Sequence, residues 1–540
     1  MFNLLNDAWL PARRAQGQFE RIRPAGITSD IEANPVVAID WPRADFRVAC
    51  IEFLIGLIAT ACPPADDEDA WIDGWENPPP PETLSAAFAP IAHAFNLDGP
   101  GPRFLQDFDD LPGDPDSPET LLIEAPGANT RRNNTALLVK PGRVSRLSRS
   151  AAAMALFTLQ CYAPSGGRGN LTSVRGGGPL TTLVLPAGER SLWHLVWANT
   201  PRRNQPLPAD LSRVFPWLAP TRTADRFPAT TPAETHPLQA FWGMPRRIRL
   251  DFADNGEGLP CDLTGGVDPV IVTGWRQRPN GVKYVGWEHP LSPAYRDNKT
   301  GAWLPVHPQP GGIGYRHWVA IALPDQAGTH RLARSIADWP ARSANVSDSD
   351  ARPRLFAAGY DMDNMKARAF VESEMPLPGA GPDAAKALSE VAHRLVNAAG
   401  VAAAALRGAV RLACFGGDAT TDSAPLAAVY ESFWAATQDR FFALLPDNPA
   451  GGWEAALKPI AAPWQRFVKF TALRLFDEAA PLDPSAASCN PQRIVEARRN
   501  LFGTLDGRGP MGGRLFEALN LPPPEPKAKR RKRATEMEPL

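Results

Sequence analysis

A stretch of 64 residues, from Ala125 to Gly188, contains no aspartate or glutamate. It carries eight fixed positive charges: Arg131, Arg132, Lys140, Arg143, Arg146, Arg149, Arg168 and Arg175. The whole chain of 540 residues is nearly neutral, with 57 basic and 58 acidic side chains, so this excess is local. Such a field attracts polyanions, and the phosphate backbone of nucleic acids is the commonest large one. The alternative is a solvated surface loop with an accidental run of arginines.

Glycine and short polar residues are dense in the same stretch. Residues 165–178 have the sequence Ser-Gly-Gly-Arg-Gly-Asn-Leu-Thr-Ser-Val-Arg-Gly-Gly-Gly. Glycine lets the backbone approach a ligand closely, and Asn, Thr and Ser can hydrogen-bond to bases, sugars or phosphates. The pattern therefore favours a surface that binds nucleic acid.

A second kind of chemistry is indicated by the carboxylates Asp361 and Asp363, with Asp348 and Asp350 nearby in the sequence. Closely spaced carboxylates can hold Mg²⁺ for phosphoryl chemistry. No histidine is close in sequence, however, so a turn that projects polar side chains is the favoured interpretation.

Other catalytic motifs are missing from the sequence. It has no HExxH, no GxxxxGK[ST] loop and no CxxC pair, and its eight histidines are dispersed. One GxGxxG occurs at Gly507–Gly512, but it contains proline and follows a predicted helix instead of a strand. We interpret it as a turn.

Composition indicates a globular protein of a reducing compartment. Hydrophobic residues make up 44% of the chain, and its 58 prolines predict many irregular connections. The six cysteines are scattered, which is typical of free thiols in the cytoplasm. The most hydrophobic stretch, Val48 to Cys62, contains Glu52 and is too short to span a membrane, so we expect a buried helix there. The start of the chain lacks the pattern of a signal peptide.

The predicted fold class is α+β, with a large irregular mixed domain over residues 1–375. Strands are expected at Arg247–Phe252, Pro269–Thr273 and His317–Leu323, separated by frequent Gly and Pro turn signals. After the loop at 376–382 the pattern changes to long amphipathic segments, and Asn490-Pro491 is an N-cap followed by proline. This pattern therefore predicts an antiparallel four-helix bundle over residues 376–521.

The tail at 522–540 is rich in proline and basic residues. It has too little apolar surface to fold, so disorder is expected. Its basic cluster suits contact with nucleic acid, an import signal or simple solubilisation.

Several separate motifs, in the same order along the chain, resemble the CasA-type large subunit of the type I-E CRISPR Cascade complex. They cover most of the first 370 residues, and the predicted bundle matches the family's C-terminal region. The matching segments are 2–9, 104–106, 125–142, 163–182, 241–247, 289–293 and 359–365.

This resemblance implies a non-enzymatic role in an RNA-guided DNA surveillance complex. The family's large subunit recognises the short protospacer-adjacent motif (PAM) on double-stranded DNA, mainly from the minor groove. It also promotes guide–target pairing and recruits a separate helicase–nuclease. The implied partners are other Cascade subunits, the CRISPR guide RNA, target DNA and that helicase–nuclease, with no cofactor and no membrane. Base pairing then identifies the long sequence, and the protein recognises only the flanking signal.

The resemblance also implies site residues. The PAM loop matches Gly166, Gly167, Arg168 and Gly169, and the strand-separating wedge matches Asp363 and Asn364, where better-known members carry glutamine at the second position. A loop near RNA and DNA matches Leu138, Val139 and Lys140. A basic residue facing the PAM is expected among Arg276, Arg278 and Lys283, with the choice open. Further basic contacts with nucleic acid are expected at Arg131, Arg132, Arg143, Arg146 and Arg175.

One departure concerns metal binding. Family members often bind zinc through two CxxC pairs, which correspond here to Ser148 and Ala151 and to Cys261 and Thr264. One thiolate of four cannot make a structural zinc site, so no metal is expected.

Two hypotheses for the function remain: a DNA-recognising subunit of an RNA-guided complex, or a metal-dependent nucleic-acid-processing enzyme that uses Asp361 and Asp363.

Overall fold

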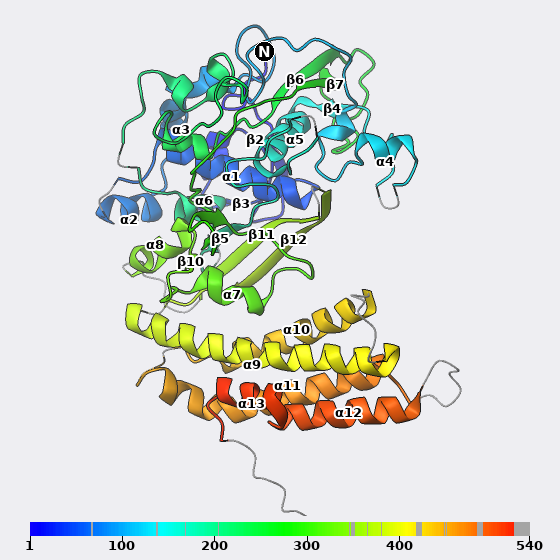
Figure 1. Ribbon diagram of the computed structural model, residues 1–540. Helices are drawn as coiled ribbons and strands as arrows, with labels where there is room; N and C mark the ends of the chain where they lie inside the picture. Colours follow the sequence, from blue (N-terminus) through cyan, green and yellow to red (C-terminus); the bar gives the residue numbers. More distant parts are fainter. Residues whose placement is uncertain are drawn as a thin grey trace, which may run out of the picture. The chain divides into compact units, whose positions relative to one another are not determined.

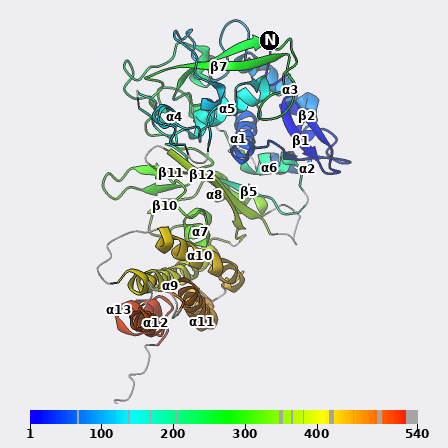
Figure 2. The same cartoon turned by 90° about the vertical axis from the view of Figure 1, so that its right-hand side faces the viewer.

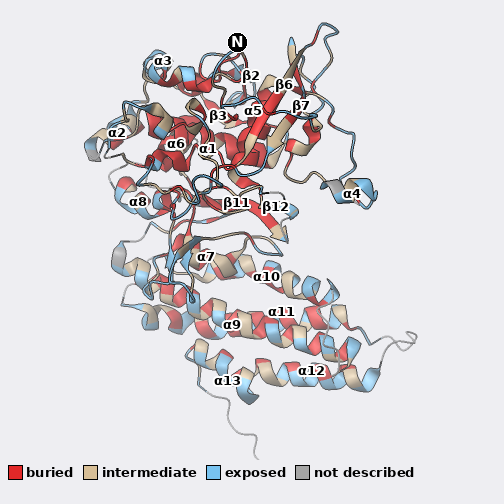
Figure 3. Ribbon diagram, turned by 45° about the horizontal axis from the view of Figure 1, so that its top comes forward, coloured by how far each residue is buried: buried red, intermediate tan, exposed pale blue. Residues whose placement is uncertain are grey.

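Helix α1 (Ala44–Ala61) is apolar on nearly every side and confirms the buried helix expected over 48–62. It packs against α5 (Arg149–Tyr162), whose N-cap Ser148 accepts a hydrogen bond from Ala151 N at 3.2 Å. Figure 3 shows both helices as mostly buried. Around them lies an aromatic core in which the Phe53 ring contacts Phe157, Trp242 and other rings edge-on.

The computed structural model describes the chain except residues 66–67, 137–138, 168, 189, 204, 345, 347–351, 364–365, 380, 417–423, 448, 450, 483–489 and 523–540. The excluded positions include Leu138, Arg168, Asn364, Asp348 and Asp350. The expectations for these residues, and for nearly all of the basic tail, thus lie outside the described residues.

By its contacts the chain divides into two units. Unit 1 consists of Met1–Ile313 and Ala320–Gly381, and unit 2 of Gly314–Val319 and Pro382–Leu540. Unit 2 therefore begins near the boundary expected at 376 but also includes a short earlier segment.

Within the described part of unit 1, helices surround small antiparallel sheets (Figure 1). The sheet orders are β2-β1-β3, β4-β7-β6, β10-β8-β9 and β12-β11-β5. The strands are β1 (Leu10–Arg14), β2 (Phe19–Ile22), β3 (Val36–Ile39), β4 (Leu147–Ser148), β5 (Thr181–Leu185), β6 (Arg247–Asp254), β7 (Val270–Arg278), β8 (Ala294–Arg296), β9 (Trp303–Pro305), β10 (His330–Arg331), β11 (Arg354–Asp363) and β12 (Lys366–Pro376). The remaining α-helices of this part are α2 (Glu68–Glu76), α3 (Pro81–Phe88), α4 (Ala128–Arg132), α6 (Leu192–Asn199), α7 (Tyr315–Ala322, shared with unit 2) and α8 (Arg334–Ser343). The strands expected near 247–252 and 269–273 are confirmed as β6 and β7.

The prediction of a strand at His317–Leu323 is wrong, because this segment belongs to helix α7 (Tyr315–Ala322). Its apolar residues Tyr315, Trp318, Val319 and Ala322 follow the i, i+3, i+4, i+7 spacing of one helix face. The continuous apolar run after His317 concealed this spacing, since short apolar runs fit a strand or a helix equally well.

Unit 2 contains a bundle of long helices, seen nearly end-on in Figure 2. Helix α9 contacts α10, α11, α12 and the shorter α13. The bounds are α9 (Pro382–Phe415), α10 (Ala424–Leu444), α11 (Trp453–Ala479), α12 (Pro491–Leu505) and α13 (Gly509–Ala518). The α+β class with a C-terminal helical bundle is thus confirmed, and the Asn490 side chain caps α12 by accepting from Arg493 N at 3.1 Å.

The GxGxxG segment is only partly the turn that we expected. Gly507 (φ 82°) forms the turn after α12, but Gly509 to Gly512 already belong to α13. Proline at the second position of α13 explains the difference, because proline is favoured in the first helical turn.

Residues Gly314–Val319 complete the bundle core. The Tyr315 ring lies 4.4 Å from that of Phe441, and its hydroxyl is 2.9 Å from Thr437 Oγ1. Trp318 contacts Phe442 at 5.4 Å, and both Tyr315 and Trp318 are 1% exposed. These two side chains are therefore core residues of unit 2.

One helix among the described residues, α9 over Asp383–Phe415, has the length and mean hydropathy (1.4) to cross a membrane. Its apolar residues Leu388, Val391 and Leu395 are buried, and Leu395 O accepts a hydrogen bond from the Trp464 indole at 2.9 Å. This is the environment of a core helix in a bundle, and one such helix is weak evidence for a membrane span.

Candidate nucleic-acid interface

The acid-free stretch divides into a buried part and exposed parts. Helix α5 and strand β5 are largely buried, so a solvated loop describes only residues 127–146 and 165–172. Arg149, at the start of α5, is paired with Asp268 at 2.8 Å and Asp98 at 3.4 Å. Among the described basic residues of the stretch, the positive charge available to a ligand is therefore confined to residues 127–146.

The first exposed segment runs from α4 to β4 and retains most of its charge. Arg131, Arg132 and Arg143 make no ion pair with any described residue, and Arg132 donates only to Asn129 Oδ1, at 2.8 Å. Arg146 differs, because its Nη2 lies 3.5 Å from Asp262 Oδ1. Of the four arginines of this segment that we predicted to contact nucleic acid, three thus have no acidic partner among the described residues.

Residues Val139 and Lys140 continue this segment and are both exposed. Lys140 Nζ donates to Ala136 O at 2.5 Å, and Gly142 N donates to Glu119 Oε2 at 2.6 Å. The segment is thereby attached to the 3-10 helix Pro118–Leu121 and leaves its basic side chains on the surface.

The glycine loop at 166–169 is closed by a hydrogen bond from Gly166 N to Asn170 O at 3.1 Å. Gly169 has φ +73°, and a Cβ there would lie 2.8 Å from Asn280 Oδ1, so the fold itself requires glycine at this position. Gly167 is exposed, has no positive φ, and a Cβ there would meet nothing within 4 Å. The fold therefore does not explain glycine at 167, whereas close approach of a ligand to the backbone would.

The glycine loop rests on the turn that follows β7. Asn280 (φ 62°) donates its N–H to Gly169 O at 3.0 Å. Asn280-Gly281 is a turn signal in the sequence, but nothing there linked it to a loop more than 100 residues earlier. Asn280 is thus a residue of this site that the sequence analysis missed.

The three basic candidates beside this turn differ in their surroundings. Arg276 Nη2 pairs with Asp251 Oδ2 at 3.2 Å across the β6–β7 ladder. Arg278 donates to Pro112 O at 2.5 Å and is exposed, and Lys283 is exposed without an ion pair to a described residue. Arg278 and Lys283 flank the turn that holds the glycine loop, so they are better placed than Arg276 to meet a ligand there.

Asp363, the predicted wedge residue, is the last residue of β11 and pairs in register with Lys366, the first of β12. The tip of this long hairpin comprises Asn364 and Met365, outside the described residues. The glycine-rich segment contacts the hairpin: a Cβ at Gly178 would lie 2.6 Å from Tyr360 O and 2.8 Å from Met362 Cγ. Residues 165–178 thus connect the turn after β7 to the β11–β12 hairpin.

The carboxylates Asp361 and Asp363 are engaged by an arginine. Arg368 binds Asp361 through two hydrogen bonds, at 2.6 and 3.1 Å, and its Nη1 lies 3.8 Å from Asp363 Oδ2. These interactions raise the pKa of Arg368, chiefly through the hydrogen bond with Asp361. Among the described residues there is no group of three or more His, Cys, Asp or Glu side chains able to hold a metal ion.

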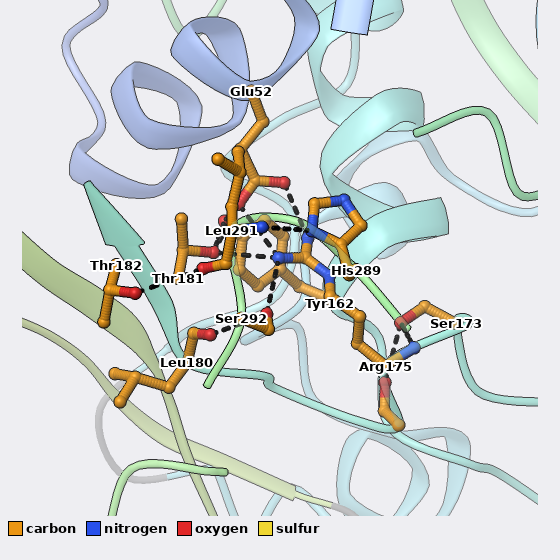
Figure 4. A network of polar contacts seen from close by, with 11 residues as sticks. Glu52, Tyr162, Ser173, Arg175, Leu180, Thr181, Thr182, His289, Leu291 and Ser292 are labelled. Carbon is orange, nitrogen blue, oxygen red and sulfur yellow. Dashed lines mark hydrogen bonds and ion pairs between the residues drawn. The ribbon is translucent and has the colours of Figure 1, made fainter. Parts of the chain in front are cut away.

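The predicted contact of Arg175 with nucleic acid is wrong, because this residue does not lie on the surface. Arg175 is 2% exposed, and its Nη2 lies 2.6 Å from Glu52 Oε2 in α1 (Figure 4). Nη1 also donates to Glu52 Oε1, Thr181 Oγ1 and Ser292 Oγ at 3.0–3.2 Å. Sequence alone could not reveal this pairing, because Glu52 lies 123 positions away from Arg175.

The same network includes the Tyr162 hydroxyl, which donates to Glu52 Oε1 at 2.5 Å. Burial would lower the pKa of Arg175, but the Glu52 charge and hydrogen bonds raise it above its ordinary value. Burial and the Glu52 charge raise the pKa of Tyr162 well above its usual range. Arg175 is therefore a buried cation that anchors the glycine-rich segment to α1.

The positions that correspond to the family's zinc ligands lie together but do not fit a zinc ion. Ser148 caps α5, and Cys261 is buried against it. Burial raises the pKa of the Cys261 thiol, but interactions with Thr264 and with nearby backbone groups lower it by more. One sulfur, two hydroxyls and the methyl group of Ala151 cannot provide tetrahedral coordination.

Hydrogen bonds link these two loops instead. Asp262 Oδ2 accepts from Ser145 N at 2.7 Å, Ser145 Oγ at 3.0 Å and Arg146 N at 3.1 Å. Asp262 N in turn donates to Arg146 O at 3.2 Å. A carboxylate thus holds the end of the basic segment next to α5.

The chain combines a mixed α+β unit with a helical bundle, and its exposed basic, glycine-rich segment has the composition of a surface that can contact nucleic acid. The family model described as CRISPR-associated protein Cse1 matches residues 3–475. The chain therefore belongs to the Cse1 family and is a CasA-type large subunit of Cascade.

Solved structures agree with this assignment at the level of the fold. Thermus thermophilus CasA (Cse1) is 18% identical with a TM-score of 0.66, and the match covers 94% of this chain and 100% of that one. Cse1 from Acidimicrobium ferrooxidans is 18% identical with a TM-score of 0.62, covering 96% and 98%. A chain of a CRISPR RNA-guided surveillance complex is 16% identical with a TM-score of 0.66, covering 93% and 99%.

Proposed function

We propose that this subunit recognises the PAM on double-stranded DNA through the glycine loop 166–169 and the turn beneath it. The observation that supports this most directly is Gly167, which is exposed and open, while its neighbours Gly166 and Gly169 are held by backbone hydrogen bonds with Asn170 and Asn280. A loop without a side chain can bring its backbone close to a narrow groove, where base edges present a simple pattern. Arg278 and Lys283 then supply positive charge on either side of the loop.

The β11–β12 hairpin acts beside this loop, where its tip separates the strands next to the PAM. Support comes from the contact of Gly178 with β11 and from the position of Asp363 at the end of that strand. Opening a short stretch of duplex lets the guide RNA begin pairing with the target strand. The exposed arginines of the first basic segment add sequence-independent binding to phosphates.

The proposed setting is a cytoplasmic complex that contains other Cascade subunits and the CRISPR guide RNA. Unit 2 serves as a docking element for neighbouring subunits and DNA, and the complex recruits a helicase–nuclease that degrades the target. The chain itself carries out no chemistry. The arrangement of Asp361 with Arg368 supports this, because a bidentate arginine occupies the carboxylate that a catalytic metal would need.

The experiment compares binding of a guide-loaded complex to PAM and PAM-less duplexes with Gly167→Asp, Gly256→Asp and Arg131→Ala. Gly256 is the matched control, because it is also exposed, has no positive φ, and a Cβ at this position would likewise meet nothing within 4 Å. Gly167→Asp is expected to bring the ratio of the two affinities close to one, whereas Gly256→Asp leaves it unchanged. Arg131→Ala is expected to weaken both targets alike and to lower the salt slope by about one.

Assembly is checked by size-exclusion chromatography before binding is measured. A Gly167→Asp complex that assembles normally and keeps its preference for PAM would show that the loop does not contact the PAM. A nuclease assay of the purified chain with Mg²⁺ or Mn²⁺ tests the enzyme hypothesis separately, and cleavage that disappears in Asp361→Asn would favour it.

A further inference from the structure

Arg246 is a half-buried arginine without an acidic partner, and it lies next to the glycine loop. The two arginines that follow it in the sequence are paired. Arg247 Nε lies 2.6 Å from Asp107 Oδ2, and Arg249 Nη2 lies 2.9 Å from Asp110 Oδ1. Arg246 makes no ion pair with a described residue, and no nearby charge affects its pKa. The fold thus compensates two of these three positive charges and leaves one uncompensated.

The backbone of Arg246 is fixed on two sides. Its N–H donates to Gln160 Oε1 of α5 at 3.1 Å, and its carbonyl accepts from Gln160 Nε2 at 3.0 Å. The turn after β7 packs on the other side, where a Cβ at Gly281 would overlap Pro245 O and lie 3.0 Å from Arg246 Cα. This residue is therefore mounted between α5 and the turn that holds the glycine loop.

The guanidinium group itself is only partly satisfied. Nη2 donates to the carbonyl of Pro164, two residues before Gly166. Nε is enclosed and has no partner. Nη1 makes no hydrogen bond with any described residue either, but it does not belong to the enclosed atoms, so it remains accessible to a ligand. Burial lowers the pKa of Arg246 to about 10, so the group is still charged at neutral pH.

A desolvated cation without a counterion is unfavourable, so a ligand that brings negative charge to Arg246 gains more than a neutral acceptor would. The edge of a base offers only neutral acceptors, whereas a phosphate offers a full charge. Arginine also matches phosphate geometry and forms strong charge-assisted hydrogen bonds with it. The contrast with Arg175, which has Glu52 as its counterion, indicates that the anion missing at Arg246 comes from outside the chain.

We propose that Arg246 Nη1 binds a backbone phosphate of the DNA beside the glycine loop. This inference rests on the proposed function, in which that loop meets the duplex at the PAM. Phosphate contacts fix the position of a duplex without reading its sequence. Arg246 therefore sets how the groove lies over Gly167, and the loop discriminates PAM from other sequences. Because the same guanidinium holds Pro164 O, the phosphate and the loop are joined through one group.

Binding of a guide-loaded complex to PAM and PAM-less duplexes is measured over a range of salt concentrations for Arg246→Gln and Arg246→Lys. The glutamine variant is expected to bind both duplexes about tenfold more weakly, with a salt slope lower by about one and the PAM preference retained. The lysine variant keeps the charge and should keep the salt slope. Arg203→Gln is the matched control, because Arg203 is also half-buried and donates to backbone carbonyls, at the end of α1 instead of at the loop.

The phosphate is identified by replacing single phosphates around the PAM with uncharged methylphosphonates. At one position the replacement should weaken binding by the unsubstituted complex about tenfold. The same replacement should cost Arg246→Gln much less, because the charge that it would lose has no partner left in this variant. This coupling is not expected for Arg203→Gln.

Several results would overturn the proposal. If Arg246 served only to hold Pro164, both of its variants would lose the PAM preference, as expected for Gly167→Asp, and would keep the salt slope. Loss of guide RNA from the variant complexes would place the phosphate on RNA, and the lack of a coupled phosphate would remove the contact. By contrast, a PAM preference that survives Gly167→Asp while the Arg246 results hold would refute only the role of the loop.

Discussion

Replacing Arg175 with methionine is expected to destabilise unit 1 by about 3–5 kcal/mol, because it leaves the Glu52 carboxylate buried without its counterion. Both residues are almost fully enclosed, with 2% and 1% exposure, so water cannot compensate for the loss. The two guanidinium contacts with Glu52, at 2.6 and 3.2 Å, are lost together. A loss of this size is a large fraction of the roughly 5–15 kcal/mol that typically stabilises a domain.

The double variant Glu52→Leu with Arg175→Met is expected to be much less destabilised than Arg175→Met alone. The surrounding hydroxyls keep partners after both charges are removed: Ser292 Oγ donates to Leu180 O at 2.8 Å, and the Tyr162 hydroxyl is 3.1 Å from Thr181 Oγ1. No buried charge then remains, so the coupling between the two sites should reach about 2 kcal/mol or more.

Hydrogen exchange of peptides from α1 and α5 measures these differences locally, since both helices belong to unit 1. Chemical denaturation followed by tryptophan fluorescence gives an independent value. A loss below about 1 kcal/mol for Arg175→Met, or single-variant losses that simply add in the double variant, would refute the idea that the pair acts as one buried unit.

Three further outcomes are expected. Gly169→Ala should lower the melting temperature whereas Gly167→Ala should not, because only the first position has a positive φ and a close neighbour; equal melting temperatures would contradict this. In a thiol-labelling time course at pH 8, the exposed Cys414 should react well before Cys50, because Cys50 is buried and burial raises its pKa to about 12. Simultaneous labelling of both thiols in the folded chain would count against the structure. Burial and the adjacent arginine lower the pKa of His317 to about 4. As the pH drops from about 6.5 towards 4, the unfolded state therefore binds this proton before the folded state does, and the free energy of unfolding should fall. Replacing His317 with glutamine should reduce that slope in pH-dependent denaturation.

The elements that could be predicted are those with local signals. The apolar run of α1, the strands β6 and β7 and the Asn490-Pro491 helix start all follow from residues close in sequence. Helix α7 was missed because a short apolar run fits two periodicities. Its true environment, a core shared with helices more than 100 residues later, has no local signature.

The candidate site shows the same division. Glycine and arginine content identified the exposed segments, but composition could not separate Arg175, which is buried, from Arg131, which is not. Likewise, Asp361 has the spacing of a metal ligand, and only the fold shows that Arg368 occupies it. The side chain that decides each role comes from a different element, and its position depends on long-range pairing.

The packing of Gly314–Val319 among the C-terminal helices means that unit 2 is discontinuous along the chain. A fragment that begins at residue 382 lacks Tyr315 and Trp318, and a fragment that ends near 376 carries them without their partners. Neither cut reproduces a natural folding unit, so exchange of the bundle between relatives requires both pieces. The same arrangement offers fragment complementation: a peptide spanning 314–319, supplied separately, has a defined place in the core of the isolated helices.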